Sequence, residues 1–162
     1  MAIHLIGVIS DTHGLIRPEA LKALQGSELI IHAGDIGSPR VLDAIGMIAP
    51  VVAVRGNTDA DGWADALPWI EVIEIGNTFL YVIHELEKID LDPSAAGFGA
   101  VICGHSHRPS VGSLKGVPVI NPGSAGPRRF KLPVSVALIR LKEGILEPIT
   151  IELNIPPANP AR

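Results

Sequence analysis

Three short apolar runs open the chain, and the segments between them have the pattern of helices. The runs are rich in β-branched residues and cover Ile3–Ser10, Glu28–Gly34 and Val51–Gly56. The intervening segments are "PEALKAL", which begins at Pro18, and "SPRVLDAIGMI", in which Ser38 is a candidate N-cap. Strands that alternate with helices are joined by crossover connections, so this part of the sequence predicts neighbouring parallel strands.

The pattern changes after Trp69, where pairs of strand-like segments are joined by short turns. The turns are Gly76-Asn77, Lys115-Gly116 and Glu143-Gly144, and each of them predicts an antiparallel hairpin. These strands carry too many apolar residues for a sheet with one open face. We therefore expect an α/β fold with two mixed sheets and helices outside them. A single domain is expected over 1–155, and a Pro-rich tail over 156–162.

Side chains that can bind metals follow five of the predicted strands. They are Asp11 and His13 after the first strand, Asp35 and Asn57 after the next two, His84 after "LYVI", and His105 and His107 after "VICG". The carboxyl ends of parallel strands share one edge of a sheet, so these seven side chains are expected to converge there.

This set of donors constrains the metal and the chemistry. Imidazoles combined with carboxylate and amide oxygens suit Mn, Fe, Zn or Ni, and the absence of thiolates argues against a structural zinc site. Seven donors exceed the needs of one tetrahedral ion. They fit two divalent ions about 3.5–4 Å apart, with a shared carboxylate and a bridging hydroxide that attacks a phosphate ester.

The order of these motifs resembles that of the calcineurin-like metallophosphoesterase superfamily, and within it the small bacterial and archaeal phosphodiesterases. The chain contains "SDTHG", "AGD", "RGNTD", "VIH" and "CGHSH" in that order, followed by "VINPGSAGPRR". The resemblance covers roughly Ile6 to Arg129. It implies a four-layer α/β sandwich with two mixed β-sheets flanked by helices.

The resemblance also implies which residues hold which ion. One ion would be bound by Asp11, His13, Asp35 and His107, and the other by Asp35, Asn57, His84 and His105, with Asp35 bridging the two. Manganese is the expected metal. The implied activity is hydrolysis of small phosphodiesters. A phosphomonoesterase or nucleotidase is an alternative, and so is a non-catalytic scaffold of the same fold.

The chain departs from the family pattern in three places. Thr58 occupies the position after Gly-Asn where larger relatives carry a histidine that protonates the leaving group. Glu85 and Leu86 replace a small residue and an imidazole beside the metals. Only twenty residues separate His84 from His105, which leaves little room for a long helix.

Other polar residues allow two interpretations each. Arg128, Arg129 and Asp59 are candidates for substrate contacts, but the arginines also suit a solvated loop, and Asp59, like Asp61, suits a cap on the following turn. His4 and His32 lie within strands and are expected to pack or to form hydrogen bonds.

Composition bears on partners and location. The net charge of −4 argues against binding to duplex nucleic acid, and no apolar run is long enough to span a membrane. The single cysteine, Cys103, is compatible with the reducing cytoplasm. A homo-oligomer is left open.

Overall fold

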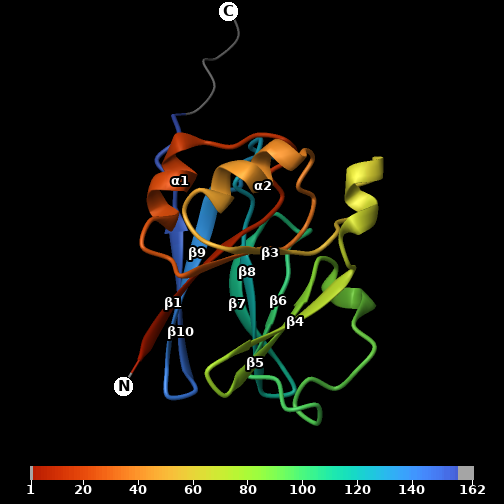
Figure 1. The fold of residues 1–162 in the computed structure, drawn as a ribbon, viewed down its shortest axis with the longest axis vertical. Coiled ribbons are helices and arrows are strands. Elements are labelled where there is room, and N and C mark those ends of the chain that lie inside the picture. The colour runs from red at the N-terminus through yellow and green to blue at the C-terminus, as the bar shows by residue number, and fades with distance from the viewer. Residues whose placement is uncertain (1, 157–162) are drawn as a thin grey trace, which may run out of the picture.

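The computed structural model describes residues 2–156 and contains two five-stranded sheets (Figure 1). The first sheet has the strand order β10-β9-β1-β2-β3. Its strands are β1 (Ile3–Ile9), β2 (Leu29–His32), β3 (Val51–Ala53), β9 (Ser135–Lys142) and β10 (Ile145–Glu152). β1, β2 and β3 are parallel, whereas β9 is antiparallel to both β1 and β10. The predicted alternation of strands and helices therefore forms the parallel half of this sheet.

The second sheet is also mixed and has the order β4-β5-β6-β8-β7. Its strands are β4 (Ile70–Ile75), β5 (Thr78–Ile83), β6 (Ala100–Ile102), β7 (Pro109–Leu114) and β8 (Val117–Pro122). β5, β6 and β8 are parallel to one another, and β4 and β7 form the antiparallel edges. All three predicted hairpins are present.

The turns of these hairpins have the backbone that their sequences predict. Lys115 and Gly116 both have positive φ, and so do Glu143 and Gly144. Two successive residues of positive φ give a turn whose twist matches that of paired strands. Glycine at the second position makes this conformation accessible at low cost.

Apolar side chains from both sheets meet between them in the main core. Ile6, Val8 and Ile31 of the first sheet belong to the same buried cluster as Leu80 and Ile102 of the second. This shared core holds the two sheets face to face.

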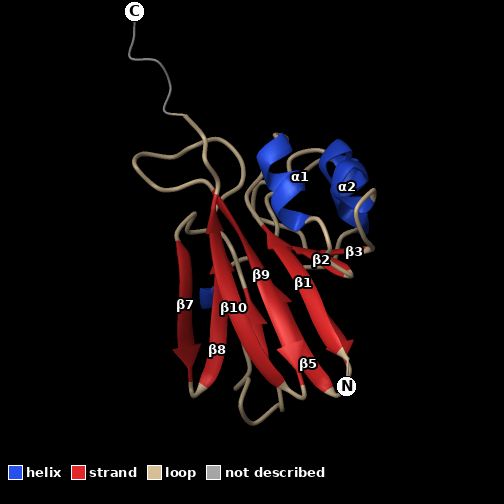
Figure 2. Ribbon diagram, turned by 90° about the vertical axis from the view of Figure 1, so that its left-hand side faces the viewer, coloured by secondary structure: helices blue, strands red, loops and turns tan. Residues whose placement is uncertain are grey.

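The outer faces of the two sheets are covered differently. Helices α1 (Pro18–Leu24) and α2 (Pro39–Gly46) lie on the outer face of the first sheet (Figure 2). α2 begins at the predicted N-cap, because the Ser38 side chain accepts a hydrogen bond from the amide of Arg40. The chain also forms two short 3-10 helices, η1 (Gly62–Ala66) and η2 (Leu86–Lys88). The outer face of the second sheet is covered by η2 and the loop after it. The predicted fold class is confirmed, and the short segment before His105 holds no long helix.

The position of the site follows from this topology. The parallel strands of each sheet end at the same edge, so the loops after β1, β2, β3, β5 and β6 lie together. No helix within residues 2–156 is long and apolar enough to cross a membrane. Of the predicted Pro-rich tail, 157–162 lie outside the described residues.

Candidate metal centre

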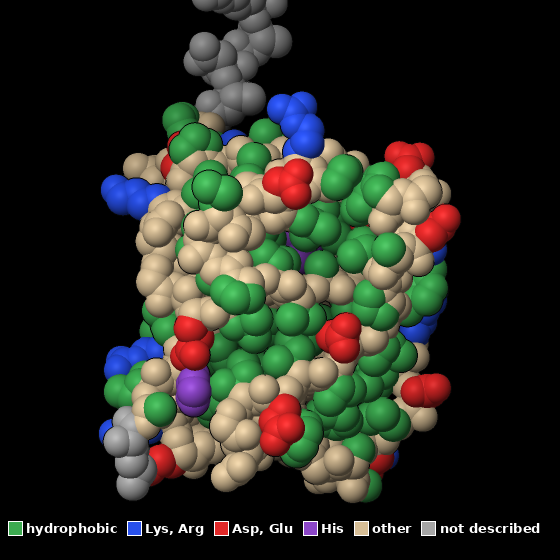
Figure 3. Space-filling view, in the orientation of Figure 1, with side chains coloured by type: hydrophobic (Ala, Val, Ile, Leu, Met, Phe, Trp, Pro, Cys, Tyr) green, Lys and Arg blue, Asp and Glu red, His purple; other side chains and the backbone are tan. Residues whose placement is uncertain are grey.

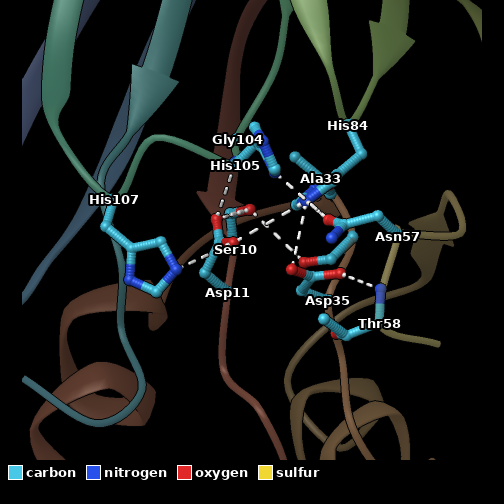
Figure 4. A network of polar contacts seen from close by, with 12 residues as sticks. Ser10, Asp11, Ala33, Asp35, Asn57, Thr58, His84, Gly104, His105 and His107 are labelled. Atoms are coloured by element: carbon cyan, nitrogen blue, oxygen red, sulfur yellow. Dashed lines mark hydrogen bonds and ion pairs between the residues drawn. The ribbon is translucent and has the colours of Figure 1, made fainter. Parts of the chain in front are cut away.

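All seven side chains predicted as metal ligands lie together at this edge. Figure 4 shows Asp11, Asp35, Asn57, His84, His105 and His107. They come from both sheets: the loops after β1, β2 and β3 approach from one side, and those after β5 and β6 from the other. The structure divides six of them into two clusters, each with ligand atoms within 4.8 Å of one another.

The first cluster consists of Asp11, His13 and His107. The Nε2 atom of His107 lies 3.3 Å from Oδ1 of Asp11 and 3.4 Å from Nε2 of His13. Two imidazole nitrogens and a carboxylate oxygen thus converge on a small volume. This is the arrangement that a cation needs, because neutral imidazoles present lone pairs to it.

The second cluster consists of Asp35, His84 and His105. The amide oxygen of Asn57 joins it, 3.1 Å from both Nε2 of His84 and Nδ1 of His105. The other ring nitrogen of His84 donates a hydrogen bond of 2.7 Å to the carbonyl of Ala33. That bond keeps a proton on Nδ1, so Nε2 is the nitrogen that faces the cluster, and it can bind a metal when it is unprotonated.

Asp35 lies between the two clusters. Its Oδ2 atom is 3.2 Å from Nε2 of His84 and 3.8 Å from Nε2 of His13. Its Oδ1 atom accepts a hydrogen bond from the amide of Thr58, which orients the carboxylate. Asp35 is therefore placed to contact ions in both clusters.

The charges of the buried groups favour cation binding. Burial by itself raises the pKa of Asp11 and of Asp35, but hydrogen bonds from His107 and Ser10 to Asp11, and from His84 and Thr58 to Asp35, outweigh it, and both pKa values lie below their usual range. Burial lowers the pKa of His84, but the hydrogen bond to Asp35, the negative charges of Asp11 and Asp35 and the hydrogen bond to Ala33 together outweigh it and raise this pKa. Oδ1 of Asp11 is buried, lies 3.3 Å from Nε2 of His107 and makes no hydrogen bond of good geometry. Two charged carboxylates among imidazoles, one of them with a poorly satisfied oxygen, fit a pair of divalent ions.

The backbone is unusual at most of these positions. Asp11, His13, Asp35, His105 and His107 all have φ between 46° and 73°, in the left-handed region. Such a conformation costs on the order of 1 kcal/mol for a non-glycine residue, and it persists where the surrounding structure enforces it for function.

Neighbouring glycines allow the close approach of these loops. A Cβ atom on Gly56 would overlap the backbone nitrogen and the carboxylate of Asp35. A Cβ atom on Gly104 would overlap the Ser10 hydroxyl and would lie 2.8 Å from Oδ2 of Asp11. The glycines beside the predicted ligands therefore make room for the carboxylates.

Further polar residues that were not predicted as part of the site hold its loops. Nδ2 of Asn121 donates to the carbonyl of Gly104 and to the hydroxyl of Ser106, and the Ser124 hydroxyl donates to the carbonyl of Asp11. Asn121 lies near the end of β8, within the segment "VINPGSAG". The reasoning that selected the ligands, a polar side chain at the end of a buried strand, also applies to Asn121.

His32 supports two of the ligand loops without joining either cluster. Its Nδ1 accepts from the amide of Gly34, so Nε2 carries the proton and donates to the Thr12 hydroxyl at 2.9 Å. Thr12 in turn donates to the carbonyl of Ile36. Because His32 is fully buried, burial lowers its pKa to about 4. The predicted hydrogen-bonding role of His32 is confirmed, as is that of His4, whose Nδ1 lies 2.9 Å from Oε1 of Glu28.

The buried His32 makes stability depend on pH. Its folded pKa lies below the unfolded value of about 6.5, so the unfolded chain binds more protons between those values and stability falls as the pH is lowered through them. For metal-free protein we expect His32 to account for a loss of about 2 kcal/mol between pH 7 and pH 5. Urea unfolding of the wild type and of His32→Gln at both pH values measures this. Equal pH dependence in the two proteins would refute it, and His4→Gln is the matched control.

The candidates for substrate contacts are not members of the two clusters. Asp59 is buried, and its carboxylate accepts hydrogen bonds from the amides of Ile36, Gly37 and Gly56. It therefore caps the loops after β2 and β3 rather than the following turn, and Asp61 makes no side-chain cap. Arg128 is exposed and donates to the carbonyl of Ile155, and Arg129 is also exposed. Substrate contact by these three residues stays a prediction.

The departures from the family pattern have structural consequences. Thr58 contacts Asp35 through its backbone. Leu86 packs against the outer face of the second sheet. Glu85 forms an ion pair of 3.4 Å with Lys88, and with Glu87 and His105 it forms a third group of ligand-type atoms.

Comparisons with known proteins agree with this geometry. Residues 5–144 match the calcineurin-like phosphoesterase superfamily domain. A probable metallophosphoesterase from Methanothermobacter thermautotrophicus is 34% identical over 94% of each chain. A solved structure described as that of a novel archaeal phosphodiesterase superposes with a TM-score of 0.74 at 22% identity, covering 91% of this chain and 99% of that one. Vps29 from Chaetomium thermophilum also gives a TM-score of 0.74, at 20% identity, covering 93% of this chain and 97% of its own. The two structural likenesses show a shared fold, and the match over residues 5–144 together with the curated relative shows that this chain belongs to the calcineurin-like phosphoesterase superfamily.

Proposed function

We propose that this protein is a metal-dependent phosphodiesterase with two divalent ions. The observation that carries the proposal is the position of Asp35, whose Oδ2 atom lies within 3.8 Å of a histidine from each cluster. A carboxylate so placed can bridge two ions, and paired ions suit in-line displacement at phosphorus.

Some residues of the chain would bind the ions, and others would orient the side chains that bind them. Asp11, His13, Asp35 and His107 would hold one ion, and Asp35, Asn57, His84 and His105 the other. When bound, the ions supply an activated water as nucleophile and neutralise negative charge on the phosphoryl oxygens. The Thr58 amide fixes Asp35, the carbonyl of Ala33 fixes the tautomer of His84, and Ser10 fixes Asp11. Manganese is the proposed metal, with iron, zinc or nickel as alternatives that the same donors accept.

We propose diesters rather than monoesters as substrates. The structural likeness to an archaeal phosphodiesterase supports this choice. Thr58 stands where larger relatives carry a histidine that protonates the leaving group, so among these diesters those with good leaving groups should react best. A nucleotidase or other phosphomonoesterase would use the same metals, and it is the alternative that the assay must separate. The likeness to Vps29 keeps a scaffold without catalysis as a second alternative.

Location and partners are proposed from the chemistry of the chain. The single cysteine, Cys103, is buried, and burial raises the pKa of its thiol to about 12, which makes it unreactive. A reducing cytoplasm suits such a chain. A net charge of −4 favours small phosphodiesters over duplex nucleic acid as partners, and a homo-oligomer is compatible with all these properties.

Purified protein supplied with Mn²⁺ is expected to hydrolyse bis-p-nitrophenyl phosphate faster than p-nitrophenyl phosphate, compared as kcat/KM. Removal of metal with EDTA should abolish turnover, and Mn²⁺ should restore it. Faster hydrolysis of the monoester would favour the phosphomonoesterase. Two bound ions per chain without turnover on either ester would favour the scaffold. Inactivity with Mn²⁺, Fe²⁺, Zn²⁺ and Ni²⁺ would refute the proposed activity.

A further inference from the structure

A pocket of about 250 Å³ adjoins the second cluster, because His84 lines both. Its apolar walls are Trp69, Ile70 and Ile83, and its polar groups are Arg55, Glu85 and Lys88. Figure 3 shows that apolar side chains gather on one face of the molecule. Pockets for drug-sized ligands measure about 300–1,000 Å³. The Arg55–Trp69 pocket, as we call it, is therefore suited to a smaller group such as a single ring system.

The polar side of this pocket is held in place by several contacts. Nε of Arg55 donates to the carbonyl of Asp59 at 2.8 Å, and its terminal nitrogen lies 3.5 Å from Oδ1 of Asp65. The guanidinium carbon lies 4.7 Å from the centre of the Trp69 ring. Asp59 is itself anchored by three backbone amides. Arg55 thus packs against Trp69 from a fixed position, and little entropy remains to be lost when a ligand binds.

Trp69 remains 53% exposed although Arg55 packs against it. A large aromatic ring in a pocket that shares His84 with the second cluster offers a π-surface to a ligand. Glu85 and Lys88, paired at 3.4 Å, add a hydrogen-bond acceptor and a donor at the same wall. The pocket therefore combines a stacking surface with polar groups that can contact the edge of a ring.

We propose that the Arg55–Trp69 pocket receives the base of a nucleoside-type ester group, so that the substrates are nucleotide phosphodiesters. A phosphate held at the second cluster lies beside His84, and an organic group attached to it can enter the pocket that His84 also lines. A nucleobase presents a flat π-face to Trp69 and hydrogen-bonding edges to Glu85 and Lys88, whereas a glycerol-like group offers no ring to stack. This inference rests on the proposed function for the position of the phosphate.

Adenosine 5′-monophosphate and ribose 5-phosphate are the probes, because they share sugar and phosphate and differ only in the base. In isothermal titrations with Mn²⁺-loaded protein, we expect the nucleotide to bind on the order of tenfold more tightly. Trp69→Ala should remove this preference, and Trp69→Phe should keep most of it. Phe79→Ala, which removes an exposed aromatic ring outside the pocket, should leave the preference unchanged.

A second measurement locates the ligand. The chain has two tryptophans, so Trp63→Phe leaves Trp69 as the only tryptophan, and the nucleotide should quench tryptophan fluorescence more than ribose 5-phosphate does. Equal affinities for the two probes, no binding of the nucleotide, or a preference that survives in Trp69→Ala would overturn the inference.

The bis-p-nitrophenyl phosphate assay separates this inference from the proposed activity. Turnover without a base preference removes the pocket inference alone. A preference that depends on Trp69, without turnover of diesters, removes the proposed activity and leaves a nucleotide-binding site. Phosphate release, measured on the titrated samples, shows whether the nucleotide itself is hydrolysed.

Discussion

Asp35→Asn is expected to lower kcat/KM for bis-p-nitrophenyl phosphate by at least about a thousandfold and to reduce bound metal to less than one ion per chain. The carboxylate lies within 3.8 Å of His13 and 3.2 Å of His84, so it is the residue positioned to bind both ions. Mutation of a residue that hydrogen-bonds to a metal ligand typically costs about 10–100-fold in metal affinity or activity. Loss of a ligand shared by both ions should cost more. Elemental analysis and steady-state kinetics on the same preparation measure both effects.

The asparagine variant separates metal loss from misfolding. It keeps the shape of the side chain and removes a negative charge close to Asp11, so the metal-free protein should remain folded by near-ultraviolet circular dichroism. Asp61→Asn, at an exposed carboxylate, is the matched control and should keep full activity. Two bound ions and full turnover in Asp35→Asn would show that Asp35 does not bridge.

His105→Ala and His107→Ala are expected each to remove one ion, and not the same ion. Both residues follow β6, but His107 faces Asp11 and His13, whereas His105 contacts Asn57. Each single variant should bind about one ion per chain and should lose activity on the order of a hundredfold or more.

Paired substitutions identify which ion is lost. His105→Ala with Asn57→Ala, and His107→Ala with His13→Ala, should each still bind one ion, because both members of a pair serve the same cluster. His105→Ala with His107→Ala should bind none. One retained ion in this last variant would show that both histidines bind the same metal. His4→Ala, which removes a histidine outside the site, should bind two ions.

Much of this architecture is predictable because the relevant signals are local. Turn residues and strand periodicity identify the three hairpins, and the alternation of strands and helices identifies the parallel strands β1, β2 and β3. The covering of the second sheet was less predictable. A segment of twenty residues between His84 and His105 excludes a long helix, but it does not show that Leu86, Ile89 and Phe98 would pack against β5 and β6.

The residues of the candidate site were predictable from their positions at the ends of apolar strands. Their hydrogen-bonding partners were not, since Asn121 and Ser124 act on residues 17 and 113 positions away. The role of Asp59 was also not evident, because its carboxylate binds amides from two loops that meet only in the folded chain.

The sequence by itself determined the fold class, the superfamily and the seven residues that meet at one edge, because strand ends and motif order are properties of the linear chain. Only the tertiary structure showed that Asp35 lies between two clusters, that His32 is buried and hydrogen-bonded to Thr12, and that Arg55 packs on Trp69 beside His84. These features depend on distances between side chains carried by different strands and loops. Such distances are set by the packing of the two sheets and by loops that fold over their shared edge.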